Sequence, residues 1–197
     1  MVEELLTDSK LIPVPKLLAN QLRLLAGRLG VSVSSITEEA LEQVLRADSM
    51  DSSLKQAVDL LHMTQVHRGA GLINFQRTAF KDLLKSVYSE DPDVLIDLWY
   101  NSGRWYAAYL SNRLNGDFFD FFKQDLLVSW NLDESDIDVK DVQVDVRLTS
   151  FGMSNEFTDL LVMYTKGFFE ELDYNVSEED VLPGLISLKF LKKLKKV

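Results

Sequence analysis

The stretch that decides the fold is residues 10–46, KLIPVPKLLANQLRLLAGRLGVSVSSITEEALEQVLR. Its first five residues, Lys10 to Val14, are short, partly β-branched and bounded by proline, which predicts an edge strand. Pro15 suits the opening of a helix, and leucines then recur at helical spacing as far as Leu29. Gly30 ends this helix as a C′ glycine does.

A second helix is predicted directly after the glycine. Ser32, Ser34 and Ser35 are all acceptable N-caps, and Ser35 with Glu38 spells a capping box ahead of a second apolar face. A unit of fewer than 40 residues with one strand and two amphipathic helices cannot close a core alone. Its single strand predicts a second copy, because a ribbon of two strands from two chains would pair the backbone groups.

This segment has a family resemblance. The residues that carry it are Ile12 and Val14 in the strand; Pro15, Leu18, Leu22, Leu25 and Ala26 in the first helix; Gly30, Val31 and Ser32 at the turn; and Ile36, Ala40 and Leu41 in the second helix. With this spacing the segment resembles the ribbon-helix-helix transcription factors. The resemblance implies a homodimer formed through residues 10–46, bound to double-stranded DNA through Lys10, Lys16, Ser32 and Ser34.

The charge and the strand sequence favour a different use of the same fold. The chain of 197 residues has 21 Lys and Arg against 31 Asp and Glu, and a net charge of −10 that opposes non-specific binding to DNA. If Ile12 and Val14 face the core, Leu11 and Pro13 face outward, and neither can make the polar contacts that specify a base. The alternative is therefore a dimeric adaptor or small-molecule-binding protein that uses the ribbon-helix-helix only for dimerisation.

The rest of the chain predicts a second domain. The polar stretch 48–53 reads as a linker, so we expect a module at 1–48 and a domain at 53–197. Apolar periodicity predicts helices near 54–67, 72–88, 92–114, 118–127 and 156–172, and alternation predicts a strand at 142–148. Leucines at steps of three from Leu185, with lysines between them, favour a C-terminal helix, docked or contacting phosphate or membrane. The fold class expected is mainly α with small β, that is, α+β.

A weaker resemblance covers this second domain. It rests on Gly71-Leu72-Ile73, on Tyr100 to Trp105 with Gly103 among them, and on Tyr164 to Phe169. These residues, in this order of elements, resemble the vinyl-reductase-type domain, a small-molecule-sensing relative of TRAPP vesicle-tethering subunits. The resemblance implies a domain that senses a small apolar ligand or a protein partner. The absence of cysteine removes metal or lipid attachment through a thiol.

Aromatic residues supply the candidate ligand site. They are dense between Trp99 and Phe122, and Trp99, Trp105, Tyr106 and Tyr109 are the pocket candidates because indole and phenol rings combine apolar surface with polar tips. The alternative is that these rings are simply core.

Sequence motifs indicate no catalytic or metal site. His62 and His67 are five residues apart, so they lie on different faces of a helix and we expect both near the surface or linker. No nucleophile elbow, phosphate loop or metalloprotease motif is present, so we expect no enzyme and no cofactor. With no signal peptide and no membrane span in the sequence, a cytoplasmic location is expected.

Overall fold

The computed structural model describes residues 11–114, 116 and 118–193. The described chain is mainly α-helical with one small antiparallel sheet, as expected. It divides into two compact units, Met1–His62 and Met63–Val197, and the boundary between them falls inside helix α3 (Leu54–Ala70).

The first unit holds a helical hairpin. Helices α1 (Lys16–Leu29) and α2 (Val33–Asp48) are joined at Gly30, whose φ of 71° is the left-handed conformation predicted for a C′ glycine. Ser32 is the N-cap of α2, and its hydroxyl accepts a hydrogen bond from the Ser35 N–H at 3.0 Å. The capping box expected at Ser35 is wrong: α2 begins two residues before Ser35, and Glu38 accepts from Ser34 instead, at 3.0 Å.

The expected edge strand does not form within one chain. The described part of it, residues 11–14, is assigned to no helix or strand, and Ile12 and Val14 are exposed. A single strand needs a neighbour for its backbone groups, and the described chain offers it none.

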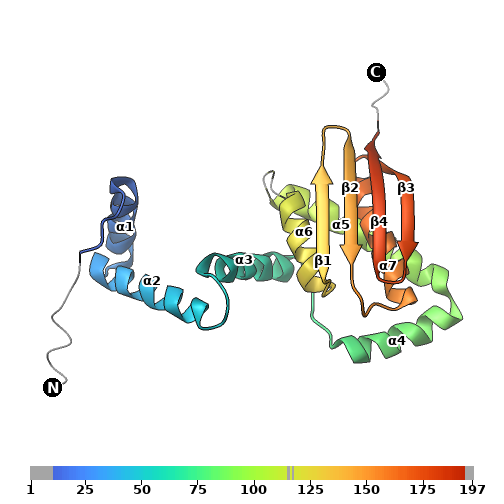
Figure 1. The fold of residues 1–197 in the computed structure, drawn as a ribbon, viewed down its shortest axis with the longest axis horizontal. Helices are drawn as coiled ribbons and strands as arrows, with labels where there is room; N and C mark the ends of the chain where they lie inside the picture. Colours follow the sequence, from blue (N-terminus) through green and yellow to red (C-terminus); the bar gives the residue numbers. More distant parts are fainter. Residues whose placement is uncertain (1–10, 115, 117, 194–197) are drawn as a thin grey trace. The chain divides into compact units, whose positions relative to one another are not determined.

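The second unit is built on a four-stranded antiparallel sheet in the order β1-β2-β4-β3. The strands are β1 (Glu134–Val139), β2 (Gln143–Thr149), β3 (Tyr174–Leu182) and β4 (Leu185–Lys192). Helices α5 (Pro92–Arg113) and α7 (Asn155–Glu171) cover one face of the sheet, and α6 (Phe118–Ser129) lies beside β1 (Figure 1). Alternate strand residues enter the core, among them Val146, Leu188 and Phe190, which are almost fully buried.

Two glycines let α5 and α7 touch through their backbones. A Cβ on Gly103 would lie 2.0 Å from the Tyr164 carbonyl oxygen, and a Cβ on Gly167 would lie 2.0 Å from the Tyr100 carbonyl oxygen. The contact is reciprocal, so each helix has its glycine where the other helix crosses. Any larger residue at either position would force the two helices apart.

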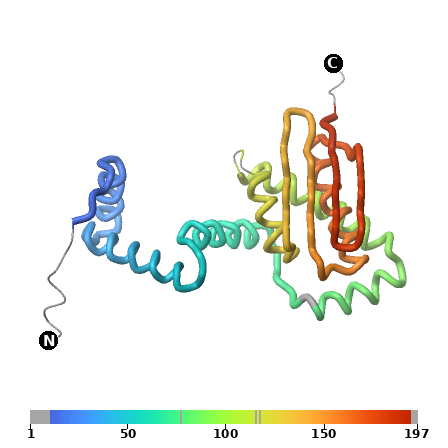
Figure 2. Tube along the Cα trace, viewed as in Figure 1, coloured from blue at the N-terminus to red at the C-terminus, as the bar shows by residue number. Residues whose placement is uncertain are grey.

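Helix α4 (Arg77–Glu90) begins five residues later than the sequence predicted. Residues 72–76 form an extended connection from α3 into α4, as the trace in Figure 2 shows. Phe75 stacks on Phe80, with ring centroids 5.5 Å apart, and this contact between the positions before the N-cap and in the first turn is a hydrophobic staple. The staple sets the start of the helix at Arg77, although apolar spacing alone extended it back to Leu72.

The C-terminal segment is a strand, so the expected helix from Leu185 is wrong. Ile186, Leu188 and Phe190 point into the core in β4, while Leu185 and Leu191 of the three-residue series are exposed. Because the segment pairs with β2 on one side and β3 on the other, its side chains alternate with the two-residue repeat of a strand. The residues from Leu194 onward lie outside the described chain.

Strand β1 was missed by the sequence analysis. The stretch is rich in Asp and Glu and has few large apolar residues, yet β1 pairs with β2 along its whole length, from Glu134 opposite Thr149 to Val139 opposite Val144. Ser135 is buried and Ile137 half-buried, so the acidic side chains occupy the opposite face. An edge strand with charged residues is a common protection against unwanted pairing.

Candidate functional site

The structure does not bring the residues expected to contact DNA together within one chain, because the starts of α1 and α2 are separated by the 14 residues of α1. Lys16 is the first residue of α1 and is exposed, and Ser32 and Ser34 lie at the start of α2. Lys10 lies outside the described residues. The Ser32 hydroxyl satisfies the Ser35 N–H, so the amides of Val33 and Ser34 are the first-turn donors of α2 that can face a ligand.

The hairpin leaves its apolar residues largely exposed. Within residues 11–62 only Ala26 and Ala47 are buried, although both helices are amphipathic. Large apolar side chains that remain substantially exposed include Ile12, Val14, Leu18, Leu41, Val44 and Leu45. Exposed apolar surface on this scale marks a surface that another molecule covers.

The four expected pocket residues do not share one cavity. Trp99 is half-buried and packs near Phe80, with ring centroids 6.2 Å apart, in a small cluster with Leu95. Tyr106 is buried in the main core. Trp105 and Tyr109 lie together on the outer side of α5, with rings stacked at a centroid distance of 5.5 Å and an interplanar angle of 9°.

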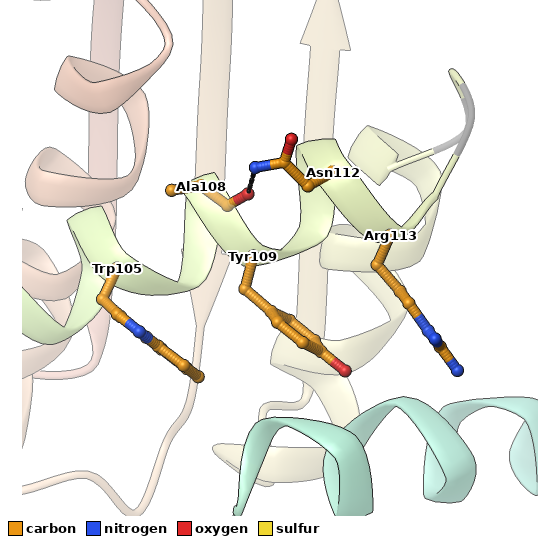
Figure 3. A pocket seen from close by; sticks show the side chains of 5 residues that line it. All are labelled: Trp105, Ala108, Tyr109, Asn112 and Arg113. Atoms are coloured by element: carbon orange, nitrogen blue, oxygen red, sulfur yellow. Dashed lines mark hydrogen bonds between the residues drawn. The ribbon is translucent and has the colours of Figure 1, made fainter.

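The Trp105–Tyr109 pair borders a shallow depression of about 330 Å³, lined also by Ala108, Asn112 and Arg113. Trp105, Tyr109 and Arg113 are spaced four residues apart, and Figure 3 shows their side chains extending from the same side of α5 toward α3. Trp105 is half exposed, at 52%. The depression therefore has an aromatic wall with a cation at one end.

Behind this surface, Asp125 of α6 forms the centre of a polar cluster. It is 4% exposed, yet its carboxylate accepts from the Tyr106 hydroxyl at 2.6 Å and from the Ser129 hydroxyl, and it lies 2.7 Å from Nε2 of His67. The pairing with His67 corrects the expectation that this histidine lies at the surface. These three partners offset the free-energy cost of burying the carboxylate, which would be large if the carboxylate had no hydrogen-bond partner.

Burial and the Asp125 charge both act on the neighbouring phenols. Burial raises the pKa of Tyr106 far above its usual value, and the Asp125 carboxylate adds to this increase. Burial and then Asp125 likewise raise the pKa of Tyr164, whose ring lies 6.2 Å from that of Tyr106. Both hydroxyls stay protonated at any physiological pH, so Tyr106 acts as a hydrogen-bond donor and not as an acid or base.

The last turns of α3 attach to α5 and α6 through this region. The Tyr109 hydroxyl donates to the Val66 carbonyl oxygen at 3.1 Å, and His67 contacts Asp125. Gly69 leaves room for the Tyr109 hydroxyl, since a Cβ there would lie 2.5 Å from it. Tyr109 is therefore both a wall of the depression and a contact to α3.

The sequence did not point to Asp125 or Arg113, and it placed His67 near the surface or linker. Only the density of aromatic residues around Trp105 pointed to this region, and the residues that meet there come from three helices. In the part of the chain that the structure describes, no group of three His, Asp or Glu side chains can hold a metal ion. No described helix is long and apolar enough to cross a membrane.

Comparison with known proteins gives no family. No family model matches the chain, and no curated protein matches it. Among solved structures, a Cs H-NOX mutant carrying an unnatural amino acid is 13% identical, with a TM-score of 0.38 over 64% of this chain and 76% of its own. A structure from a study of heme distortion in the H-NOX family is also 13% identical, with a TM-score of 0.38 over 72% of this chain and 90% of its own. A T. tengcongensis H-NOX variant is 13% identical, with a TM-score of 0.36 over 72% of this chain and 93% of its own. Likenesses this slight carry no argument about function.

Proposed function

We propose that this protein is a homodimeric, DNA-binding transcriptional regulator of ribbon-helix-helix type, whose second unit senses a small ligand and catalyses no reaction. The observation that carries the proposal is the exposure of the apolar faces of α1 and α2 in a single chain, where only Ala26 and Ala47 are buried. A second copy would cover these faces and would pair the segment around Ile12 and Val14 as a two-stranded ribbon.

The start of α2 supplies the contact to a DNA phosphate. The amides of Val33 and Ser34 are first-turn donors at the positive end of the helix dipole, which favours an anion. Lys16 adds one positive charge at the start of α1. Contacts of this kind position a protein on the duplex, and base reading is left to the ribbon.

The exposure of Leu11 and Pro13 favours one rival, a dimeric adaptor that never binds DNA. Leu11 is fully exposed, and a leucine in the major groove can contact a thymine methyl but makes no hydrogen bond to a base edge. Lys and Arg are also outnumbered over residues 1–49, at five against seven Asp and Glu.

The first test is capture of fragmented DNA from the source genome by the purified full chain at about 150 mM salt, followed by sequencing. Phosphate-only binding is suppressed at this salt concentration. Enrichment of sites made of two symmetric half-sites supports the regulator. A folded dimer that enriches none supports the adaptor and refutes the regulator.

The second test removes one phosphate donor without disturbing α2. Val33 is the first residue of α2 and follows Ser32 with a ψ of 153°, so Val33→Pro fits the backbone and deletes only the N–H. We expect Val33→Pro to weaken binding to the enriched site by about 10-fold, the order of one charge-assisted hydrogen bond. Val33→Ala, the matched control, keeps the amide and should bind as the parent does; equal affinities for the two variants would refute the phosphate contact at α2.

The third test concerns Lys16. Lys16→Gln should weaken binding and reduce the slope of log K against log salt by about one, because one phosphate is no longer neutralised by the lysine. Lys55→Gln removes the same charge from α3 and serves as the control, since Lys55 pairs locally with Asp59. An unchanged salt dependence for Lys16→Gln would remove Lys16 from the DNA interface.

A further inference from the structure

The row formed by Trp105, Tyr109 and Arg113 on α5 has the chemistry of a site for one class of small molecule. Successive members are four residues apart, which places them about 6 Å apart along one side of the helix. One indole and one phenol ring lie nearly parallel, so the row offers flat apolar surface next to a guanidinium.

Arg113 is available to a ligand. It is exposed, and none of the described carboxylates forms an ion pair with it. A second arginine of α5, Arg104, shows the contrast, because its guanidinium donates twice to Glu171 of α7. A guanidinium recognises a carboxylate with two parallel hydrogen bonds, and it does so best beside low-dielectric surface.

Trp105 supplies the surface that a flat ring would cover. It is 52% exposed although it belongs to the most hydrophobic residue types, and Tyr109 covers only part of it. Stacking of a further aromatic ring on Trp105 would remove the remaining apolar area from water. The depression of about 330 Å³ beside these residues is at the lower end of the volumes that hold small ligands.

We propose that the row formed by Trp105, Tyr109 and Arg113 binds planar aromatic carboxylates, with the ring on Trp105 and Tyr109 and the carboxylate on Arg113. The proposal deepens, and so rests on, the sensing role proposed for the second unit. The hydroxyl of Tyr109 is already committed to the Val66 carbonyl of α3, so it fixes the ring and leaves the charge recognition to Arg113. A bound ligand would therefore touch the side chain that holds the end of α3.

The test uses 2-naphthoate as the probe, titrated into the full-length protein by calorimetry, with 2-naphthamide as its uncharged counterpart. We expect 2-naphthoate to bind at least 10-fold more tightly than the amide. Arg113→Gln should remove this preference, and Trp105→Leu should weaken the binding of both compounds by 10-fold or more. Both side chains are exposed, so the variants should fold as the parent does, which circular dichroism checks.

Arg147→Gln is the matched charge control, because Arg147 is an exposed arginine on β2, outside the depression. It should leave the affinity for 2-naphthoate unchanged. No binding of 2-naphthoate up to 1 mM, equal binding of the amide, or an Arg113→Gln variant that binds as the parent does would each overturn the proposal.

The two proposals fail separately. DNA capture without any added compound tests the regulator, and naphthoate binding without DNA tests the site on α5. A protein that binds its DNA sites but not 2-naphthoate refutes the ligand class alone. One that binds 2-naphthoate through Arg113 but captures no DNA retains the ligand site and is an adaptor or binding protein.

Discussion

Residues 11–62 and residues 63–193 both contain helices rich in apolar residues, but they bury these residues very differently. In the first unit only Ala26 and Ala47 are buried, whereas the second unit contains a continuous core that includes Phe122, Phe168 and Phe190 at full burial. The second unit has a sheet on which its helices can pack. The first has no sheet among its described residues and leaves large apolar side chains of α1 and α2 exposed, as expected if the proposed second copy covers them.

If a second copy covers the apolar side chains of the first unit, dimer formation should be sensitive to charges introduced among them. We expect Leu18→Glu to dissociate the dimer, because each copy would lose a buried leucine and bury a carboxylate, at about 4 kcal/mol per dimer or nearly a thousandfold in the dissociation constant. Light scattering as a function of concentration measures it. Asn20→Asp places the same charge on the side of α1 opposite Leu18 and should leave the dimer intact.

If Leu18→Glu remains a dimer, the exposed apolar face of α1 does not form the interface between the copies, and the difference between the two units needs another explanation. The second unit should be unaffected in either case. All tyrosines and tryptophans lie at or beyond residue 88, so their fluorescence and near-ultraviolet circular dichroism report the second unit alone.

The second unit should be most sensitive where α5 and α7 cross. Gly103→Ala would place a methyl group 2.0 Å from the Tyr164 carbonyl oxygen, and the helices must separate to admit it. We expect a loss of about 3 kcal/mol in the free energy of unfolding, measured by urea denaturation followed by tryptophan fluorescence.

Gly27→Ala provides the opposite result in the first unit. Gly27 lies within α1 and its added Cβ would meet nothing within 4 Å, so the substitution should stabilise the helix by about 0.5–1 kcal/mol. The change is followed by far-ultraviolet circular dichroism. Similar losses at Gly103 and Gly27 would show that close helix packing does not distinguish the two units.

A smaller loss than at Gly103 is expected at the polar cluster around Asp125. Asp125→Ala removes the acceptor for Tyr106, Ser129 and His67, and we expect a loss of about 2 kcal/mol from the buried groups left without a partner. Asp136→Ala, which breaks an exposed pair with Lys123, should cost less than about 1 kcal/mol. Equal losses in the free energy of unfolding for the two variants, measured by urea denaturation, would show that the burial of Asp125 does not increase its contribution to stability.

Much of the local structure could be predicted from the sequence. The spacing of leucines in α1, Gly30 at its end and the aspartate and proline that open α5 are signals that act within a few residues. Where two periods compete, local signals are not enough. The C-terminal segment reads as helical at steps of three and as a strand at steps of two, and pairing with β2 and β3 selects the strand.

The candidate site was predictable only in part. The aromatic density of α5 pointed equally to four residues. Trp105 and Tyr109 do stack beside the depression, but Tyr106 turns into the core and Trp99 packs near Phe80. Neighbours in sequence face different directions on a helix, so a cluster in sequence is divided among several surfaces in space. The role of Arg113 emerges only from its position one turn beyond Tyr109 and from the absence of an ion pair among the described carboxylates.

By itself, the sequence determined α1, α2 and α5 of this protein and the turn at Gly30, because caps, glycines and prolines act over a few bonds. Only the tertiary structure decided the strand order, the crossing of α5 and α7 at Gly103 and Gly167, and the meeting of His67, Tyr106 and Ser129 at Asp125. These depend on contacts between residues far apart in the chain. Such contacts form only when the buried surface they create outweighs the entropy of bringing the segments together.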